Sequence, residues 1–154
     1  DESAVLEAIA DKKIKKYVTD FANPTTAGKD GVILTPHLGA STEESEDNCA
    51  MMAVREIRDY LENGNIVHSV NFPDCNMGGC DKAGRVAILH KNKKGMIGKY
   101  STVFGNADIN IEDMTNKSKG NFAYTLLDID TPVTKEVVDQ LREIEGVLKV
   151  RVVK

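Results

Sequence analysis

The chain has 154 residues, of which 20 are basic and 24 acidic, so its formal net charge is −4. This balance leaves no basic field that would attract nucleic acid or an anionic membrane surface, and we expect neither as a partner. The cysteines Cys49, Cys75 and Cys80 are odd in number and lack a nearby histidine pair, which argues against a metal site or disulfide framework and favours the reducing cytoplasm. No apolar run approaches the roughly 20 residues of a membrane span.

The first 40 residues predict a piece of an α/β domain. Apolar side chains recur at helical spacing over residues 1–16 and predict an amphipathic helix. A strand-like stretch follows at 17–21, and Val-Ile-Leu at 32–34 predicts a strand buried on both faces, as in parallel sheets covered by helices. Two such strands cannot make a sheet, and the chain begins without methionine. We therefore expect residues 1–40 to be the tail of a larger domain.

A long helix and a linker are predicted next. Ser41 and Glu44 have the spacing of a capping box, and apolar residues then recur at helical intervals, which predicts a helix from Thr42 to Asn63. The stretch from Asn71 to Gly84 contains proline and glycine without periodicity and predicts a linker. The expected domains are therefore 1–73, a linker at 74–83 and a compact domain at 84–154.

The last 71 residues, 84–154, alternate strands and helices. Strands are predicted at 85–90, 109–114, 122–129 and 147–153, with one helix at 96–104 and another that begins at Thr131-Pro132 and ends at Gly146. In the first strand, Val86, Ile88 and His90 share one face. The order βαββαβ predicts a ferredoxin-like α+β fold, with both helices on one face of an antiparallel sheet. The other face and one edge are expected to be uncovered, which favours pairing with a partner.

The junction between the strand at 85–90 and the next helix is a candidate binding site. His90 and Asn92 lie at the strand end, and Gly95 precedes the free N–H groups of the helix start. Such N–H groups suit a carboxylate and side-chain acceptors suit an ammonium, so the combination fits a small zwitterion. The alternative is an ordinary solvated turn, which on residue types alone is the commoner case.

The motif His90-x-Asn92-x-x-Gly95, together with Asn110, resembles that of ACT domains, the small-molecule sensing modules of amino-acid metabolism. The whole chain resembles the C-terminal part of the phosphoglycerate dehydrogenase family, NAD-dependent D-isomer 2-hydroxyacid dehydrogenases of L-serine biosynthesis. Thr-Pro-His-Leu-Gly-Ala-Ser-Thr at 35–42 and Ser-Val-Asn-Phe-Pro at 69–73 carry this second resemblance.

The resemblance implies an effector site made by His90, Asn92, Gly95 and Asn110, with L-serine or a similar small amino acid as ligand. In the family this site lies between two domains whose sheets join edge to edge, with the second asparagine supplied by the partner. A homo-oligomer paired through its sheet edges is therefore expected. A free-standing amino-acid-binding protein without an enzymatic parent is the alternative.

The resemblance also assigns parts of a dehydrogenase active site to the first segment. It makes His37 the acid/base of the parent enzyme and places Asp20, Gly39 and Ala40 near the nicotinamide of NAD. Asn23 stands before a proline where many relatives carry a glutamate, which puts the usual carboxylate relay in doubt. The chain contains no G-x-G-x-x-G phosphate loop, so we expect it to be inactive and to bind no cofactor by itself.

Overall fold

The computed structural model describes residues 1–154, which form two compact units, Asp1–Met51 and Met52–Lys154. In the first unit, α1 spans Glu2–Ala10 and begins at Asp1, whose carboxylate accepts the N–H groups of Ser3 and Ala4. The helix is shorter than the predicted 1–16 because Lys12 adopts a left-handed conformation with a φ of 58°, and the N–H groups of Lys12 and Lys13 turn back to the carbonyls of Ile9 and Ala8.

Two short strands complete the first unit. The parallel pair consists of β1, Tyr17–Thr19, and β2, Val32–Leu34. Ile33 and Leu34 are 46% and 37% exposed. The prediction that 32–34 is buried on both faces is therefore wrong for this chain, because one helix and two strands are too few elements to cover both sides of a sheet.

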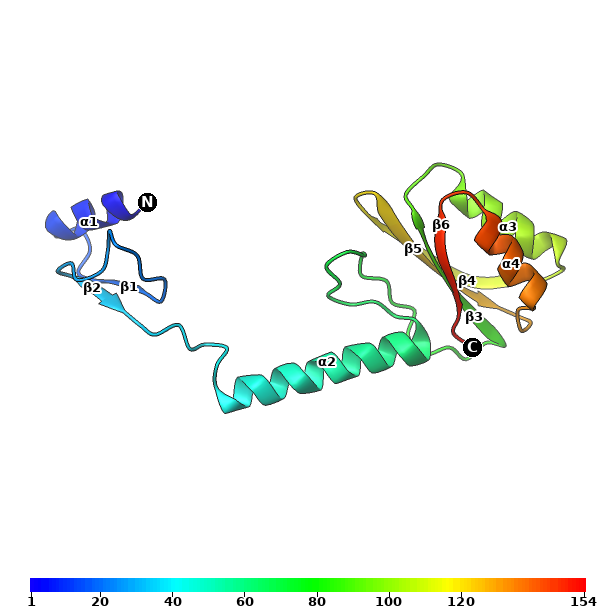
Figure 1. Cartoon of the computed structure of the whole chain (residues 1–154), viewed down its shortest axis with the longest axis horizontal. Coiled ribbons are helices and arrows are strands. Elements are labelled where there is room, and N and C mark those ends of the chain that lie inside the picture. The colour runs from blue at the N-terminus through cyan, green and yellow to red at the C-terminus, as the bar shows by residue number, and fades with distance from the viewer. The chain divides into compact units, whose positions relative to one another are not determined.

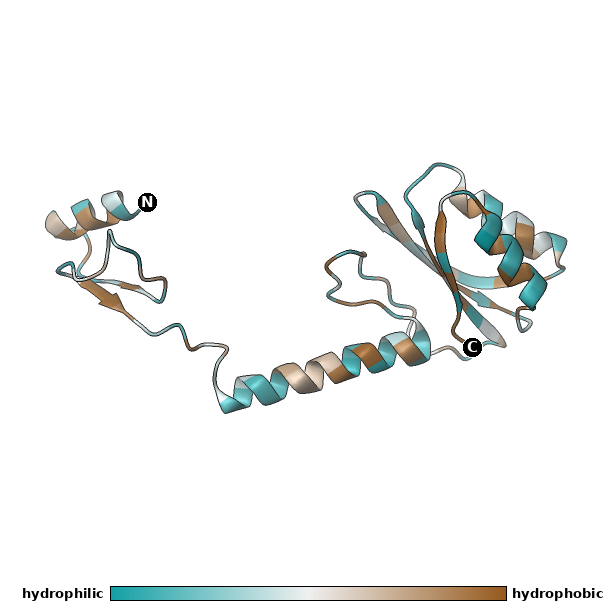
Figure 2. Ribbon diagram, in the orientation of Figure 1, coloured by the Kyte–Doolittle hydropathy of each residue, from teal (hydrophilic) through white to brown (hydrophobic).

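The helix α2 spans Glu43–Asn63, close to the predicted range. The hydroxyl of Thr42 accepts the N–H of Ser45 at 3.1 Å, so Thr42, and not the predicted Ser41, caps the helix. The apolar stripe of α2 is exposed to solvent, with Val54 and Ile57 each 59% exposed and Leu61 57% exposed. Figure 2 shows this stripe in brown along the helix. None of the four helices in the chain combines the length and apolarity of a membrane span.

The second unit contains an antiparallel four-stranded sheet with strand order β4-β5-β3-β6. Its strands are β3 Gly84–Lys91, β4 Ile111–Lys119, β5 Phe122–Ile129 and β6 Val147–Val152, and its helices are α3 Met96–Asn106 and α4 Lys135–Glu143. Both helices lie on the same face of the sheet (Figure 1). The predicted ferredoxin-like βαββαβ fold is confirmed.

The main core lies between the sheet and these two helices. Val86 and Ile88 of β3 pack there against Tyr100 and Phe104 of α3 and Leu141 of α4, and all five side chains have no exposed surface. His90 lies on the same face, with its ring edge-on to Tyr100 at 5.4 Å. The predicted alternation of the first strand is therefore confirmed.

The opposite face of the sheet is partly covered, which corrects the prediction that it is open. A second cluster joins Ile66 and Cys75 to Ala87, Tyr124 and Leu126 of the central strands. Ile66 and Cys75 also form an antiparallel backbone bridge, and Cys75 is only 1% exposed. Residues 64–78 thus pack on the sheet, because scattered apolar side chains bury themselves there without any local periodicity. The division of the chain at 73 and 84 stays a prediction.

Two element boundaries also differ from prediction. Strand β4 begins at Ile111 and runs to Lys119, beyond the predicted end at 114, because β5 supplies hydrogen-bonding partners along its polar second half. Helix α4 is capped by Thr134, whose hydroxyl accepts the N–H of Val137 at 3.4 Å. Thr131-Pro132 is therefore part of the preceding loop and not the helix start.

Candidate functional site

The loop between β3 and α3 presents an open helix start. Gly95 is the N-cap of α3 with a φ of 79°, and no side chain caps the helix. A β-carbon at this position would meet no atom within 4 Å, so the backbone conformation and not crowding is what calls for glycine. The N–H groups of the first turn have no intrahelical acceptors, and an anion can therefore bind against them.

His90, in contrast, is buried beneath this loop and only 2% exposed. Its Nδ1 lies 2.9 Å from the carbonyl oxygen of Lys91, which can only accept, so we assign the ring hydrogen to Nδ1. Its Nε2 lies 3.0 Å from the hydroxyl of Thr125 and 3.2 Å from Oδ1 of Asn116. Both ring nitrogens of His90 are thus engaged within the chain.

Sequence reasoning missed Asn116 and Thr125, which hold the Nε2 side of His90. The two also lie close to each other, with the Thr125 hydroxyl 2.7 Å from Asn116 Oδ1, and the single hydrogen of that hydroxyl serves either Asn116 or His90 Nε2. Thr125 is a polar residue with no exposed surface within the buried run of β5. That interruption was the only local signal, and it does not reveal which residue lies opposite.

Asn92 is exposed at the start of the loop. Its Nδ2 donates to the carbonyl of Gly120 at 3.2 Å, and its backbone N–H donates to the carbonyl of Asn121 at 2.9 Å. The side-chain oxygen makes no hydrogen bond. Asn92 therefore offers a free acceptor next to the open start of α3.

Asn110 lies at the other end of the sheet. Asn110 precedes Ile111, which is paired with Ile129, and Ile129 is in turn paired with Gly84, the first residue of β3. Asn92 follows the last residue of that same strand, Lys91. The backbone of Asn110 is fixed by Asp130, whose carboxylate accepts its N–H at 3.0 Å, while its side chain makes no hydrogen bond. Within one chain, the predicted site residues Asn92 and Asn110 are therefore not brought together.

In the first unit, His37 is brought together with Asp20. Its Nδ1 lies 3.3 Å from the Asp20 carboxylate and 3.2 Å from the Asp20 carbonyl oxygen, and its ring packs edge-on against Phe21. His37 has a φ of 53°, which is uncommon for a residue other than glycine. Both side chains of the pair are largely exposed.

The other predicted residues of this unit do not contact His37. Asn23 accepts the N–H groups of Thr25 and Thr26. The carbonyl of Gly39 accepts the hydroxyl of Ser45 at 3.2 Å, and the exposed Ala40 lies in the same turn. No group of three or more His, Cys, Asp and Glu side chains in the chain is arranged to hold a metal ion.

Comparison with known proteins adds a family to this geometry. The chain is 28% identical over 163 residues to D-3-phosphoglycerate dehydrogenase of Haemophilus influenzae, covering 99% of the chain and 40% of that protein. It is 33% identical over 112 residues to D-3-phosphoglycerate dehydrogenase 2 of Saccharomyces cerevisiae, covering 70% of the chain and 24% of that protein. This chain is a relative of the D-3-phosphoglycerate dehydrogenases. The resemblance to phosphoglycerate dehydrogenases that was inferred from the sequence is confirmed.

The chain spans 40% or less of the length of these curated relatives. No family model matches it. Among solved structures, the ACT domain from GTP pyrophosphokinase of Chlorobium tepidum aligns with 45% of this chain and 94% of its own, at 25% identity and a TM-score of 0.40.

Proposed function

We propose that this chain is the C-terminal part of an NAD-dependent D-3-phosphoglycerate dehydrogenase of L-serine biosynthesis in the cytoplasm. Residues 1–73 would come from its catalytic domains, 74–83 would connect, and 84–154 would be a regulatory ACT domain that binds L-serine or a similar small amino acid. The observation that carries the proposal is the similarity to these dehydrogenases along nearly the whole chain, combined with the open start of α3 beside Asn92.

The free groups around the loop match the parts of an amino-acid zwitterion. The carboxylate would lie against the N–H groups that follow Gly95, and the free side-chain oxygen of Asn92 would accept the ammonium. His90 would reach the ligand's hydroxyl only by exchanging one of its bonds to Asn116 and Thr125. If His90 keeps these partners, its role is to hold the loop through the bond from Nδ1 to the carbonyl of Lys91.

A second copy of the chain would complete the site through strand β4. This strand lies at one edge of the sheet, with β5 as its only neighbour. If two copies of β4 paired antiparallel about Thr115, Asn110 of the partner subunit would lie beside Gly120, whose carbonyl holds Asn92. The same register would set Asp113 opposite the partner subunit's Lys117, which favours this pairing. Strand β6 forms the other edge, and pairing through it would leave these asparagines apart.

The dehydrogenase chemistry itself requires more than this chain contains. By resemblance, His37 would exchange the hydroxyl proton of the substrate, with Asp20 holding its Nδ1. However, Asp20, His37, Gly39 and Ala40 would reach only the nicotinamide end of NAD, and no glycine-rich loop is present for the pyrophosphate. These residues alone do not fit a dinucleotide, and we propose that the chain by itself binds no NAD and turns over no phosphoglycerate.

Calorimetric titration with serine, glycine and alanine tests the ligand site. Asn92→Ala and Asn110→Ala should each remove an interaction worth about 1–3 kcal/mol and weaken serine binding roughly tenfold or more. Asn48→Ala, an exposed amide on the first half of α2, is the matched control and should leave the affinity unchanged. Because the site is shared, serine should also tighten the dimer in sedimentation measurements.

The proposal would be rejected if Asn92→Ala and Asn110→Ala bound serine as tightly as the parent chain and the Asn48→Ala control. It would also be rejected if the parent chain bound no serine. The alternative, a free-standing amino-acid-binding protein, also predicts serine binding, so the genomic context must separate the two. An upstream reading frame that is continuous with this chain and encodes a glycine-rich dinucleotide loop supports the dehydrogenase. An independent start of translation at this segment supports the alternative.

A further inference from the structure

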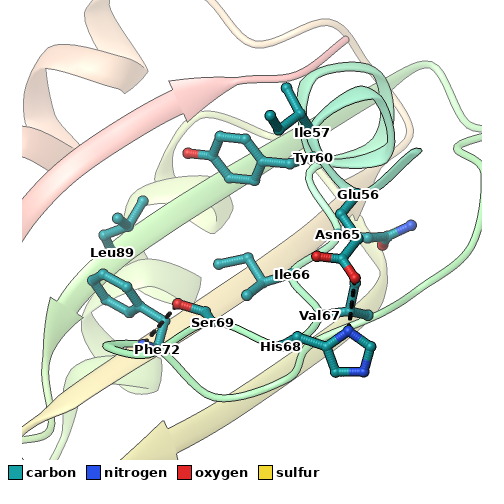
Figure 3. Close-up of a pocket in the computed structure, with 10 residues that line it drawn as sticks. All are labelled: Glu56, Ile57, Tyr60, Asn65, Ile66, Val67, His68, Ser69, Phe72 and Leu89. Carbon is teal, nitrogen blue, oxygen red and sulfur yellow. Dashed lines mark hydrogen bonds and ion pairs between the residues drawn. The ribbon is translucent and has the colours of Figure 1, made fainter. Parts of the chain in front are cut away.

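A cavity lies on the sheet face opposite α3 and α4, away from the loop between β3 and α3. Its volume is about 390 Å³, within the range of roughly 300–1,000 Å³ typical of small-molecule sites. Figure 3 shows that this open cavity is lined by the last turns of α2, by residues 65–72 and by strand β3. Its lining is mainly apolar and consists of Ile57, Tyr60, Ile66, Val67, Phe72 and Leu89, with Glu56, Asn65, His68 and Ser69 as the polar members.

The walls of this cavity are fixed by bonds to the sheet. The hydroxyl of Tyr124 donates to the carbonyl of Gly64 at 2.7 Å, and Arg85 donates to the carbonyls of Asn63 and Gly78 at 3.0 and 2.7 Å. The ring of Phe72 packs edge-on against Tyr124 at 6.4 Å. A site that is formed before the ligand arrives loses little ordering entropy on binding.

The cavity combines apolar walls with unused donors. Tyr60 and Phe72 present aromatic rings, and Leu89 of β3 lies at the same end of the cavity (Figure 3). The hydroxyl of Tyr60 makes no hydrogen bond. The oxygen of Ser69 accepts the N–H of Phe72 at 3.1 Å, but its own hydrogen has no acceptor. Two hydroxyl hydrogens are therefore free to bind an acceptor on a ligand.

A lysine lies beside this end of the cavity. Lys149 of β6 is directly opposite Leu89 in the antiparallel register, and side chains at such positions share one face of a sheet. Lys149 is exposed and forms no ion pair within the chain. The acidic residue of the lining, Glu56, is already paired with His68 at 2.7 Å. Lys149 is therefore an unpaired cation beside the cavity, whereas the Glu56 carboxylate is held by His68.

We propose that this cavity binds a small aromatic carboxylate. The ring would lie among Tyr60, Phe72 and Leu89, and the carboxylate would face Lys149 and the free hydroxyl hydrogens. This site is independent of the proposed amino-acid site, because the two lie on opposite faces of the sheet. Three indoles of similar size separate the contributions of ring and charge: indole-3-acetate is anionic, indole is neutral and tryptamine is cationic.

The test is a titration of the 154-residue chain with each indole, followed by the shifts of its backbone amide resonances. Indole-3-acetate should shift the amides of residues 57–72 and 89 and should bind at least about tenfold more tightly than indole or tryptamine. Lys149→Glu and Leu89→Glu should each weaken its binding by about tenfold or more. Lys149 is at the surface, so its substitution keeps the test valid even if Leu89→Glu fails to fold.

Val152→Glu is the matched control, because Val152 is 46% exposed on the same strand but is paired with Val86, so it points to the other face. It should bind indole-3-acetate as the parent chain does, and both β6 variants should keep the parent's response to serine. Equal affinity for indole and indole-3-acetate, no effect of Lys149→Glu, or no saturation by about 10 mM would each overturn the proposal. None of these outcomes bears on the serine titration.

Discussion

Arg85 and Asp128 lie directly opposite each other on β3 and β5 and form a buried ion pair. Their exposed fractions are 0% and 4%, and Nη2 of Arg85 lies 2.7 Å from Oδ2 of Asp128. Arg85 also donates to the carbonyls of Asn63 and Gly78. A single buried guanidinium therefore ties the end of α2 and the segment that follows it to the centre of the sheet.

Arg85→Ala should lower the free energy of unfolding by about 3–5 kcal/mol, because it leaves the Asp128 carboxylate buried without its partner. Urea denaturation of the parent and variant chains measures this difference. Arg85→Met combined with Asp128→Leu removes both charges and should recover most of the loss. A cost below about 1 kcal/mol for Arg85→Ala would show that Asp128 finds water or another donor.

Two buried tyrosines should respond in opposite ways to loss of the hydroxyl. The Tyr100 hydroxyl has no hydrogen-bond partner, and burial raises the pKa of Tyr100 well above its usual range. Tyr100→Phe should therefore leave the free energy of unfolding unchanged or raise it by about 1 kcal/mol. The Tyr124 hydroxyl donates to the carbonyl of Gly64, so Tyr124→Phe should lower the free energy of unfolding by about 1–2 kcal/mol. Thermal unfolding of both variants tests the contrast, and equal effects would contradict it.

Charge reversal on β4 tests the proposed pairing of two chains. Lys117→Glu should weaken the dimer, because it would place a carboxylate opposite Asp113 of the other copy. Asp113→Lys should weaken it in the same way, and the double variant should restore it by reversing both signs. Sedimentation equilibrium at low salt gives the dimer affinity of each chain. A double variant weaker than either single one would rule out this register.

His68 and Glu56 should titrate as a pair. The hydrogen bond to Glu56, followed by the charge of Glu56, raises the pKa of the His68 imidazole above 6.5. Any stabilisation from this pair is therefore complete below about pH 6.5 and is lost as the pH rises through the raised pKa of the folded state. Glu56→Gln should return the His68 pKa toward 6.5, as read from its ring proton resonances. Glu62→Gln is the control. Glu62 lies more than one helical turn from Glu56 and is paired with Arg58, so this change should leave the His68 pKa where it is in the parent chain.

Local pattern was sufficient for much of the second unit. The periodicity of apolar residues predicted β5 at 122–129 and the face of β3 that carries Val86, Ile88 and His90, because both depend on the two-residue repeat of a strand. The adjacency of Asn92 and Gly95 in one loop also followed from their spacing. The burial of His90 did not, because Asn116 and Thr125 reach it from two other strands.

By itself, the sequence determined the order of the elements, the ferredoxin-like fold and the loop with an open helix start, since these depend on short-range spacing and on glycine. Only the tertiary structure decided that residues 64–78 cover the second face, that a cavity forms beneath Tyr60, and that Arg85 meets Asp128, 43 residues away. These contacts depend on strand register and on packing between distant segments. Neither is encoded in a local repeat, because the free energy of each contact arises only when both partners are already placed.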